Sequence, residues 1–503
     1  MSFELYLAGL SYFSNPIIYV ASFLGVLVGI IFGALPGLTA TMTIAVFIPF
    51  TFGMDPIVSF AFLLGLYTGA VYGGSISAIL INIPGTPSAI ATSLDGYPMC
   101  QQGRAGEAIG ISTVSSALGG FFSVIVLCLA APLIANLAIK FSAEEYVGIT
   151  LIGLSIIAII SPGSTVKGLI GGVLGLILGT VGIDSISNYP RMLFGQAELI
   201  DGISVIPVMI GVYGLAEMFT QISSNVNKKV VTQKLTKVVP SFKDIKRLMP
   251  TIFRSSIIGT FIGAIPAAGG SIAALVAYGQ EKKFSKNKHL LGTGIIDGIA
   301  APEAANNAST GGALIPMMTL GIPGDPMTAV LMGGLIIQGL RPGPILFQQQ
   351  MPFVSSIFIS LLLSVVFMLI IGLGGARIFS KLITVRKNYL IPAILVFCLI
   401  GSYAINNSVF DIWTLIIAGL VGFALKQVKF SVAPIILGMI LGPLFESNLR
   451  RSIMLSQGDW STFVTRPYSL FFLVVVFLIL AGPLLMKLAR KLLRKNKSEP
   501  KGV

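Results

Sequence analysis

The sequence predicts an all-α polytopic membrane protein with about ten to twelve membrane segments and two inverted-topology repeats that contain broken helices or re-entrant hairpins. Composition, the placement of charge and a duplicated set of motifs lead to this prediction. Of the 503 residues, 54% are hydrophobic and only 10% are charged, whereas soluble domains carry about 25% charged residues. Apolar stretches recur from Ile17 to Met486, and each is close to the roughly 20 residues that a helix needs to cross a bilayer.

The basic residues are placed as topology signals. The net charge is +14, yet no Lys or Arg precedes Arg104. Basic residues collect in 223–250 and again from Lys487 to Lys501. Short loops that are rich in Lys and Arg stay in the cytoplasm. The charge therefore predicts membrane orientation and contact with the lipid bilayer, and it gives no reason to expect nucleic acid as a partner.

The chain divides into five segments by hydropathy and charge. Residues 1–222 form a first membrane repeat and residues 223–250 a basic cytoplasmic linker. Residues 251–350 hold the core motifs of a second repeat, and residues 351–486 read as scaffold-like membrane helices. Residues 487–503 form a basic cytoplasmic tail.

Two sets of motifs recur in the same order in the two halves. Gly-Ala-Leu-Pro-Gly-Leu-Thr-Ala-Thr at 33–41 is matched by Gly-Ala-Ile-Pro-Ala-Ala-Gly-Gly-Ser at 263–271. A Gly-Gly pair then runs into Ile-Pro-Gly-Thr-Pro within 73–87, and another runs into Ile-Pro-Gly-Asp-Pro within 311–326. The spacing from Gly-Gly to Ile-Pro-Gly differs by one residue between the copies. Chance seldom gives two matched pairs in order, so the sequence indicates an internal repeat.

The two copies are expected to enter the membrane from opposite sides. The segment that leads into Gly33 follows an N-terminus without basic residues, which is predicted to be periplasmic. Its counterpart before Gly263 follows the basic linker, which is predicted to be cytoplasmic. Opposite entry makes the repeats inverted, an arrangement on which many secondary transporters are built.

The Ile-Pro-Gly-x-Pro segments are the best candidates for a solute site. Proline blocks the helical hydrogen bond and glycine permits unusual backbone angles, so helices break here inside the membrane. Broken helices offer N-termini to anionic groups and free carbonyl oxygens to a cation. Kinks and tight helix packing are the structural alternative, since small residues are common at membrane helix contacts. The duplication favours a functional site.

Polar residues beside the breaks are the candidate ligands. The expected solute contacts are Thr39, Thr41, Ser75, Asn82, Gly85, Thr86, Ser271, Asn306, Thr310 and Gly324. Asn307, Ser309 and Asp325 are the expected neighbours of a sodium ion, because amide, hydroxyl and carboxylate oxygens suit a hard cation. Asp297, Glu303 and Asp325 are also singled out as acidic residues within membrane segments, which are costly and by default functional.

Enzymatic activity is not expected. His289 is the only histidine, so the chain can form neither a Ser–His pair inside the membrane nor a multi-histidine zinc site. No Walker-type phosphate loop is present, which argues against ATP hydrolysis. No cofactor is expected apart from sodium as a coupling ion. The main alternatives are a stand-alone carrier or a channel for another small solute.

The motifs resemble those of one transporter family. They are the segment at 33–41, Tyr-Thr-Gly-Ala-Val-Tyr-Gly-Gly-Ser-Ile-Ser-Ala-Ile-Leu-Ile-Asn-Ile-Pro-Gly-Thr-Pro at 67–87, Asp-Gly-Tyr-Pro at 95–98, and the stretch from Ala301-Pro-Glu-Ala-Ala-Asn-Asn-Ala to Ile322-Pro-Gly-Asp-Pro. With these motifs, the chain resembles over almost its full length the large membrane subunit of the tripartite tricarboxylate transporters.

The resemblance implies a multi-pass protein of the bacterial inner membrane that works in a three-part system. Its implied partners are a small four-helix membrane subunit and a periplasmic solute-binding protein. The implied activity is import of a di- or tricarboxylate, such as citrate, by cation symport without ATP. The oxygen-rich motifs favour sodium over the proton as the coupling ion.

Overall fold

The computed structural model describes residues 8–160, 164–184, 186–223, 237–266, 268–382 and 387–497. Part of the predicted basic linker, residues 224–236, and the last residues of the predicted tail, 498–503, lie outside these ranges. Their cytoplasmic placement stays a prediction. Helices make up nearly all the regular structure that is described, which confirms the all-α class.

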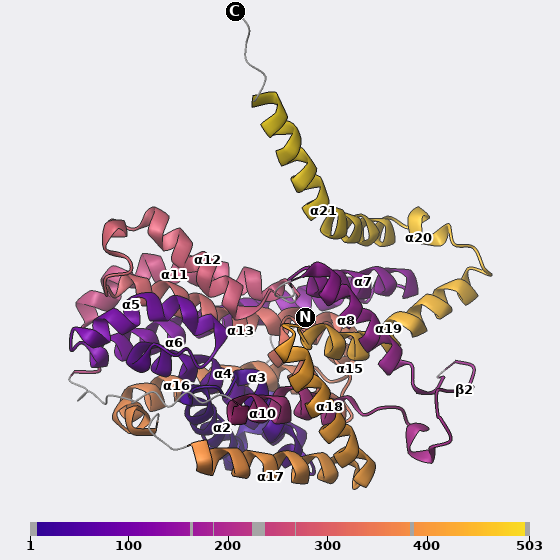
Figure 1. Cartoon of the computed structure of the whole chain (residues 1–503), viewed down its shortest axis with the longest axis horizontal. Helices are drawn as coiled ribbons and strands as arrows, with labels where there is room; N and C mark the ends of the chain where they lie inside the picture. Colours follow the sequence, from indigo (N-terminus) through magenta and orange to yellow (C-terminus); the bar gives the residue numbers. More distant parts are fainter. Residues whose placement is uncertain are drawn as a thin grey trace, which may run out of the picture. The chain divides into compact units, whose positions relative to one another are not determined.

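The chain packs as two units, each built from separate stretches of sequence (Figure 1). Unit 1 contains Met1–Ile139 and Ser204–Gln427, and unit 2 contains Lys140–Ile203 and Val428–Val503. The helices of unit 1 are η1 (Ser11–Ser14), α2 (Pro16–Ala34), α3 (Ala40–Phe47), η2 (Ile48–Thr51), α4 (Pro56–Ile81), η3 (Pro87–Ala89), α5 (Ile90–Gln101), α6 (Ala105–Ala138), α9 (Val205–Met209), the π-helix η5 (Ile210–Leu215), α10 (Ala216–Ser223), α11 (Phe242–Ala264), α12 (Gly269–Phe284), η6 (Lys288–Leu290), α13 (Asp297–Leu320), α14 (Pro326–Ile337), α15 (Pro344–Gln349), α16 (Met351–Leu382), α17 (Lys387–Asn406) and α18 (Val409–Gln427). The elements of unit 2 are α7 (Ala143–Ile160), α8 (Thr165–Gly179), β1 (Gly182–Ile183), β2 (Pro190–Arg191), η4 (Ala197–Leu199), α19 (Ala433–Leu455), α20 (Thr462–Thr465) and α21 (Pro467–Lys497). The five predicted sequence segments follow different boundaries and remain predictions of organisation along the chain.

Several helices of unit 1 begin at local sequence signals. The side chain of Asn15 caps α2, which starts with Pro16, and Asp55 caps α4, which starts with Pro56. Ser241 caps α11. A capping oxygen satisfies an amide that lacks a helical partner, and proline at the first position lacks the amide altogether. The helix starts therefore follow directly from the residues.

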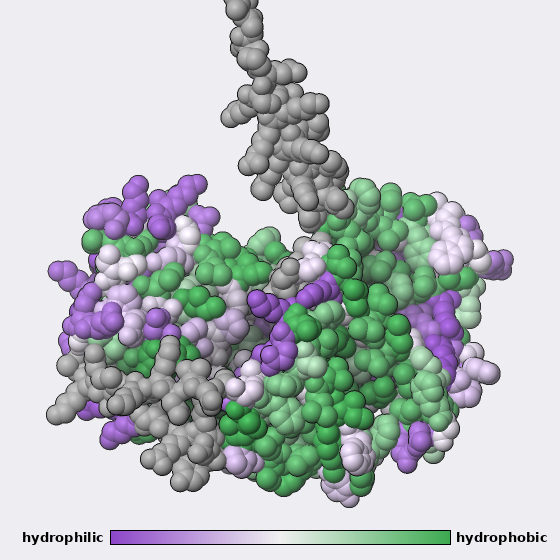
Figure 2. Space-filling view, viewed as in Figure 1, coloured by the Kyte–Doolittle hydropathy of each residue, from purple (hydrophilic) through white to green (hydrophobic). Residues whose placement is uncertain are grey.

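Six described helical segments are long and apolar enough to cross a membrane. They are Pro16–Ala34, Pro56–Ile81, Ala105–Ala138, Val205–Ser223, Met351–Lys381 and Val409–Gln427. Five shorter apolar helices accompany them: Ala40–Thr51, Thr165–Gly179, Pro326–Ile337, Ile391–Asn406 and Pro467–Gly482. Figure 2 shows large apolar areas on the visible surface, as expected for side chains that face lipid rather than water. The polytopic membrane architecture is confirmed. The predicted number of ten to twelve membrane segments is reached only when the shorter apolar helices are counted with the six long ones.

The internal repeat appears as duplicated helix packing. In the first copy, Gly33 of α2 packs against the backbone of Ala70 on α4. In the second copy, Gly263 of α11 packs against the backbone of Ser309 on α13. The first helices of the two copies are offset by 230 positions and the second helices by 239. The pairs α2–α4 and α11–α13 are therefore built on the same backbone contacts.

The duplicated packing fixes the register of the two Gly-Gly pairs. Gly73 lies against the backbone of Ile30, and Gly312 lies against the backbone of Thr260. Gly73 therefore corresponds to Gly312, and Gly74 corresponds to Ala313. In this register, the one-residue difference in spacing seen in the sequence disappears. Gly74, the second glycine of the first pair, matches Ala313, the residue that follows the second pair.

The two copies also pack on each other reciprocally. Helix α6 follows the first break and packs on α13, while α16 follows the second break and packs on α4. Helix α12 packs on η3 and α5, while α3 packs on α14. Reciprocal contacts are what an approximate two-fold relation between repeats produces. The opposite orientation of the repeats in a membrane remains a prediction.

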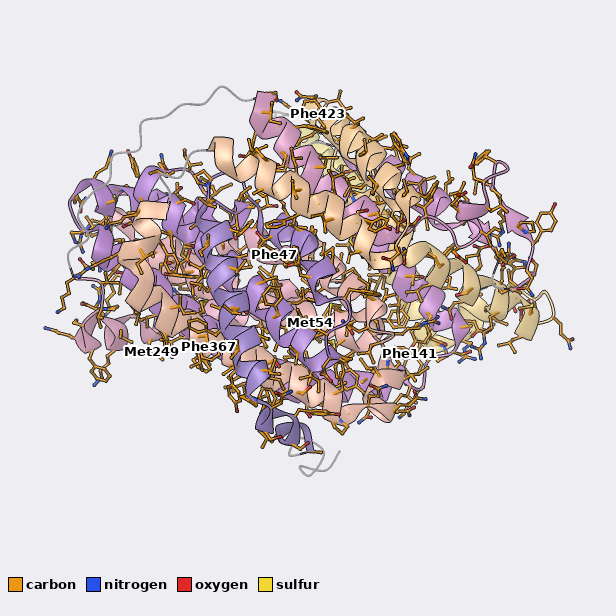
Figure 3. All side chains as sticks on the ribbon, turned by 90° about the horizontal axis from the view of Figure 1, so that it is seen from below. Phe47, Met54, Phe141, Met249, Phe367 and Phe423 are labelled. Carbon is orange, nitrogen blue, oxygen red and sulfur yellow. The ribbon has the colours of Figure 1, made fainter. Side chains whose placement is uncertain are left out.

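An aromatic cluster packs around α3. Phe47, the last residue of α3, is labelled in Figure 3. Its ring lies 5.2 Å from that of Phe32 on α2, 6.1 Å from that of Phe62 on α4 and 6.4 Å from that of Phe397 on α17 (centroid distances). The pairs with Phe32 and Phe62 are edge-on, and the pair with Phe397 is tilted. Edge-on aromatic pairs at such distances are favourable beyond the area they bury. The cluster holds α3, the short helix that follows Pro36-Gly37, in place.

In unit 2, helix α19 packs on α7 and α8, and β1 pairs with β2 as a short antiparallel hairpin. Charged residues fix this hairpin to α19. Asp184 lies 2.6 Å from the guanidinium groups of both Arg191 and Arg450, and Arg191 also pairs with Glu446 at 2.8 Å. The hydrogen bond from Ser187, the amide of Ile186 and the two arginines hold the pKa of Asp184 well below its usual value.

Replacing Asp184 with Asn should make the midpoint temperature of thermal unfolding in detergent less sensitive to acidic pH. Because the folded pKa is lowered, the carboxylate stabilises the fold above its unfolded pKa of about 3.9, and this stabilisation is lost as the pH falls further. We expect the variant to unfold at a lower midpoint temperature than the wild type at pH 7. Near pH 3, the gap between the two midpoint temperatures should be smaller. Asp201→Asn, an exposed position of the same unit, is the control. A gap that stays constant with pH would contradict the prediction.

Candidate functional site

The first break follows α4 and returns the chain onto the same helix. Asn82 takes a left-handed backbone conformation (φ 55°) and ends α4, and its side chain is exposed. The amide of Gly85 donates to the carbonyl of Gly74 at 3.2 Å. A Cβ on Gly85 would overlap the carbonyl oxygen of Gly33. Thr86 is buried, and its hydroxyl lies 3.0 Å from that of Ser88.

The second break repeats this geometry with one added charge. Gly321 (φ 70°) ends α13 at the position that corresponds to Asn82. A Cβ on Gly324 would lie 2.8 Å from the carbonyl oxygen of Gly263, as the register of the repeat requires. Asp325 then replaces the Thr86 of the first copy. The two breaks therefore share a backbone path and differ in charge.

Asp325 is the N-cap of α14. Its Oδ1 accepts from the amide of Thr328 at 2.7 Å and from the Thr328 hydroxyl at 2.8 Å, and that hydroxyl also accepts from the Asp325 amide at 2.9 Å. Its Oδ2 accepts from the hydroxyl of Tyr67 on α4 at 3.3 Å. Both copies thus contribute to the environment of this carboxylate, whose oxygens can each accept more than one hydrogen bond.

The candidates that follow Pro36 in the first copy and Pro266 in the second are half-buried; they are Thr39, Thr41 and Ser271. Thr39 caps α3 by accepting from the amide of Met42 at 3.2 Å, and Thr41 lies in the first turn of that helix. The carbonyl of Gly37 (φ 90°) accepts from Gln221 of α10 at 2.7 Å. In the second copy, Ser271 is half-buried near the start of α12. Helix α12 packs on η3 and α5 of the first copy, and α3 packs on α14 of the second.

Four predicted polar residues line one stretch of α13. Asn306, Asn307, Ser309 and Thr310 are all buried. The hydroxyls of Ser309 and Thr310 donate to the carbonyls of Asn306 and Asn307, each at 2.7 Å, within their own helix. Asn306 lies beside Gly270 of α12, and its Nδ2 is 3.5 Å from the carbonyl of Val71. The Oδ1 of Asn307 has no hydrogen-bond partner among the described residues. A buried acceptor without a donor is costly, so this oxygen is suited to a ligand.

Glu303 lies one turn before Asn307 and is fully buried. Ser75 of α4 donates to its Oε1 at 2.5 Å, Thr92 of α5 donates to the same oxygen, and Ser116 of α6 donates to its Oε2 at 2.8 Å. The sequence singled out Ser75 and Glu303 but gave no reason to connect them, and it missed Thr92 and Ser116. The one available signal was the run of Ser112, Thr113, Ser115 and Ser116 in an otherwise apolar segment.

Two other buried carboxylates have structural partners. Asp297 pairs with Arg247 of α11 at 2.7 Å. Asp95 accepts from the backbone amides of Gly292, Gly294 and Ile295 at 2.9–3.1 Å and from Tyr278 at 2.9 Å. These contacts hold the loop before α13 in place. A transport role for Asp297 stays a prediction.

The candidate residues therefore fall into two groups around α13. Asp325 meets Tyr67 at the second break, while Glu303 meets Ser75 deeper in the unit. Among the described residues, no hydrogen bond joins the first-copy and second-copy solute candidates directly, although the helices that carry them pack on one another. Such an arrangement supplies amide, hydroxyl and carboxylate oxygens from both repeats, with neither Lys nor Arg in the repeated motifs.

Comparison with known proteins matches the chain to one transporter family. The family model described as the tripartite tricarboxylate transporter TctA family matches residues 19–437. An uncharacterised 52.8 kDa protein in the TAR-I ttuC' 3' region of Agrobacterium vitis is 39% identical over 461 residues, which covers 92% of each chain. A protein in the TAR-II ttuC' 3' region of the same organism is 40% identical over 225 residues, 44% of this chain and 93% of the other. No solved structure matches the chain.

Proposed function

The chain belongs to the tripartite tricarboxylate transporter TctA family and is a membrane subunit of such a transporter, and from this premise we propose that it imports a di- or tricarboxylate, citrate-like, by cation symport. Sodium is the proposed coupling ion. The proposed partners are a small four-helix membrane subunit and a periplasmic solute-binding protein, and the proposed location is the bacterial inner membrane.

The duplicated helix break is the observation that carries the proposal. At each break a helix ends in a left-handed residue, a glycine packs on a backbone carbonyl of its own repeat, and a new helix begins. Discontinuous helices from two repeats form the solute and ion sites of many secondary transporters. The reciprocal packing supports a shared site, because each break adjoins a helix of the other copy.

The difference between the breaks suits an anion and a cation together. The helix start after the first break has no side-chain cap at Thr86 or Ala89 and no acidic residue in its first turn, so it does not repel a carboxylate group. The start of α14 is already capped by Asp325, whose negative charge disfavours a second anion. We therefore place the carboxylate solute towards the first break and sodium towards Asp325 and Asn307.

The amide, hydroxyl and carboxylate oxygens of α13 and the second break support sodium as the coupling ion. The unpartnered Oδ1 of Asn307 and the Oδ2 of Asp325, which accepts from Tyr67, are suitable ligands. A stand-alone carrier or a channel for another small solute remains the alternative function. A channel would not need a binding protein and would not concentrate its solute.

Uptake by proteoliposomes tests the proposal. The vesicles contain both membrane subunits, and the binding protein is added outside with radiolabelled citrate, succinate or malate. We expect accumulation of at least one of these under an inward sodium gradient, about tenfold above vesicles with equal sodium on both sides. Omitting the binding protein should abolish this accumulation of solute. Solute entry without the binding protein, or entry that only equilibrates, would favour the carrier or channel alternatives.

A further inference from the structure

Tyr213 carries a buried hydroxyl group that the described part of the chain leaves unused. It lies in the π-helix η5, within the membrane segment Val205–Ser223. Its hydroxyl oxygen is buried and has no hydrogen-bond partner among the described residues. A serine or threonine hydroxyl can turn onto a carbonyl of its own helix, but the rigid ring of a tyrosine holds its hydroxyl away from its own backbone. A buried hydroxyl without a partner is costly, so this one is suited to a ligand.

Two glycines hold the helix backbone on either side of Tyr213. A Cβ on Gly211 would lie 2.6 Å from the carbonyl oxygen of Leu415 on α18. A Cβ on Gly214 would lie 3.0 Å from the sulfur of Cys398 on α17. A π-helical turn accommodates an extra residue and is frequent at functional sites. Close packing on α17 and α18 therefore fixes the position from which the Tyr213 ring projects.

The helix that carries Tyr213 contacts the helices that follow the breaks of both copies. Gly333 of α14 packs on Met209 of α9, and η5 packs on α3. Beyond η5, Gln221 of α10 donates to the carbonyl of Gly37, just before α3. Helices α3 and α14 also pack on each other. Tyr213 therefore lies, along its helix, between a contact with the second copy and a contact with the first.

The charge of Asp325 reaches Tyr213 through the protein interior. The hydrogen bonds of Asp325 come from Thr328 and Tyr67, and they do not include Tyr213. Sodium needs oxygen atoms that offer lone pairs, which Asp325 and Asn307 supply, whereas an anion needs hydrogen-bond donors. The unused O–H of Tyr213 is therefore better suited to an oxygen of the solute than to sodium.

Helix α12 adjoins both breaks. A Cβ on Gly269, at the start of α12, would lie 3.4 Å from the Cβ of Asp325 at the second break. The same helix packs on η3, which follows the first break. Both breaks therefore adjoin one helix, an arrangement that suits a solute with a carboxylate group at each end.

We propose that the Tyr213 hydroxyl donates a hydrogen bond to a second carboxylate group of the solute, so that Tyr213 selects di- and tricarboxylates over monocarboxylates. The inference rests on the proposed import function. One carboxylate group of the solute lies towards the first break, and the second lies between Tyr213 and the sodium ion. Asp325 alone would repel the second group. Sodium compensates that charge, so the second carboxylate group binds only after sodium.

Thermal unfolding of the purified subunit in detergent tests the inference without transport. In the absence of solute, Tyr213→Phe should unfold at or above the wild-type midpoint temperature, because the hydroxyl that it removes has no partner. Tyr72→Phe should unfold below it, because the Tyr72 hydroxyl lies 2.6 Å from that of Thr113. With saturating sodium, Tyr213→Phe should need about tenfold more succinate or citrate than wild type for equal stabilisation, which is about 1.4 kcal/mol of binding free energy. Butyrate, with a single carboxylate group, should act equally on both proteins.

Uptake by the complete transporter gives the second measurement. The initial rate of succinate uptake should fall about tenfold in Tyr213→Phe, while the sodium concentration for half-maximal uptake stays at the wild-type value. Tyr146→Phe, which changes a half-buried tyrosine of α7 in unit 2, should leave both quantities unchanged.

A Tyr213→Phe protein with the wild-type succinate requirement would overturn the inference. A changed sodium requirement with an unchanged succinate requirement would also overturn it, because the hydroxyl would then serve the cation. If no carboxylate stabilises or enters the wild type, the import function itself fails, and the inference falls with it.

Discussion

Replacing Gly85 or Gly324 with Ala is expected to destabilise the protein strongly. A Cβ on Gly85 would overlap the carbonyl oxygen of Gly33, and one on Gly324 would lie 2.7 Å from the Cα of Ala313. Both contacts are with backbone atoms, which cannot rotate away as a side chain can. Overpacking of a filled interior costs about 1–3 kcal/mol, occasionally more. Thermal unfolding in detergent should show a clearly lowered midpoint for each variant, and valine should prevent stable expression.

Gly279→Ala is the matched control for this experiment. Gly279 lies within α12, and a Cβ there would meet nothing within 4 Å. Alanine is the better helix former by about 1 kcal/mol, so this variant should be as stable as wild type or slightly more so. A Gly85→Ala protein that is as stable as the control but inactive would show that Gly85 approaches solute, as the sequence had suggested, rather than the backbone of Gly33.

The fold was predictable where a local pattern determines it. Hydropathy gives the membrane class, and Asn15-Pro16 and Asp55-Pro56 give helix starts, because capping and proline geometry act over a few residues. The duplication was also visible as sequence. The register of the Gly-Gly pairs was not, because it depends on which glycine contacts the facing backbone. Helix α13 has no long apolar stretch, since other helices rather than lipid cover it.

The site was predictable only in part. Asp325-Pro-Met-Thr328 carries the spacing of a helix cap, so the capping role could have been read from the sequence. The partners of Glu303 could not, because Ser75, Thr92 and Ser116 come from three helices whose contact with α13 is set by tertiary packing. Hydroxyl groups in membrane helices are common and point to no particular carboxylate.

Replacing Asp325 with Asn should raise the sodium concentration for half-maximal uptake by about tenfold, equivalent to about 1.4 kcal/mol of binding free energy. The variant removes the negative charge that we place beside sodium. Asn caps a helix about as well as Asp, so α14 should keep its start and the thermal midpoint should change little. The pH profile should stay that of the wild type, because sodium is the proposed coupling ion. Sodium-dependent citrate uptake by the complete transporter measures the effect.

Thr328→Val separates the charge of Asp325 from its role as a cap. The change keeps the carboxylate but removes the hydroxyl that donates to Oδ1 at 2.8 Å and accepts from the Asp325 amide at 2.9 Å. Losing a buried cap partner costs about 1–3 kcal/mol, so the thermal midpoint should fall while the sodium requirement stays near that of wild type. If Asp325→Asn leaves the sodium requirement unchanged, the carboxylate serves only to start α14. Sodium would then have to bind elsewhere, with the unpartnered Oδ1 of Asn307 as the next position to replace.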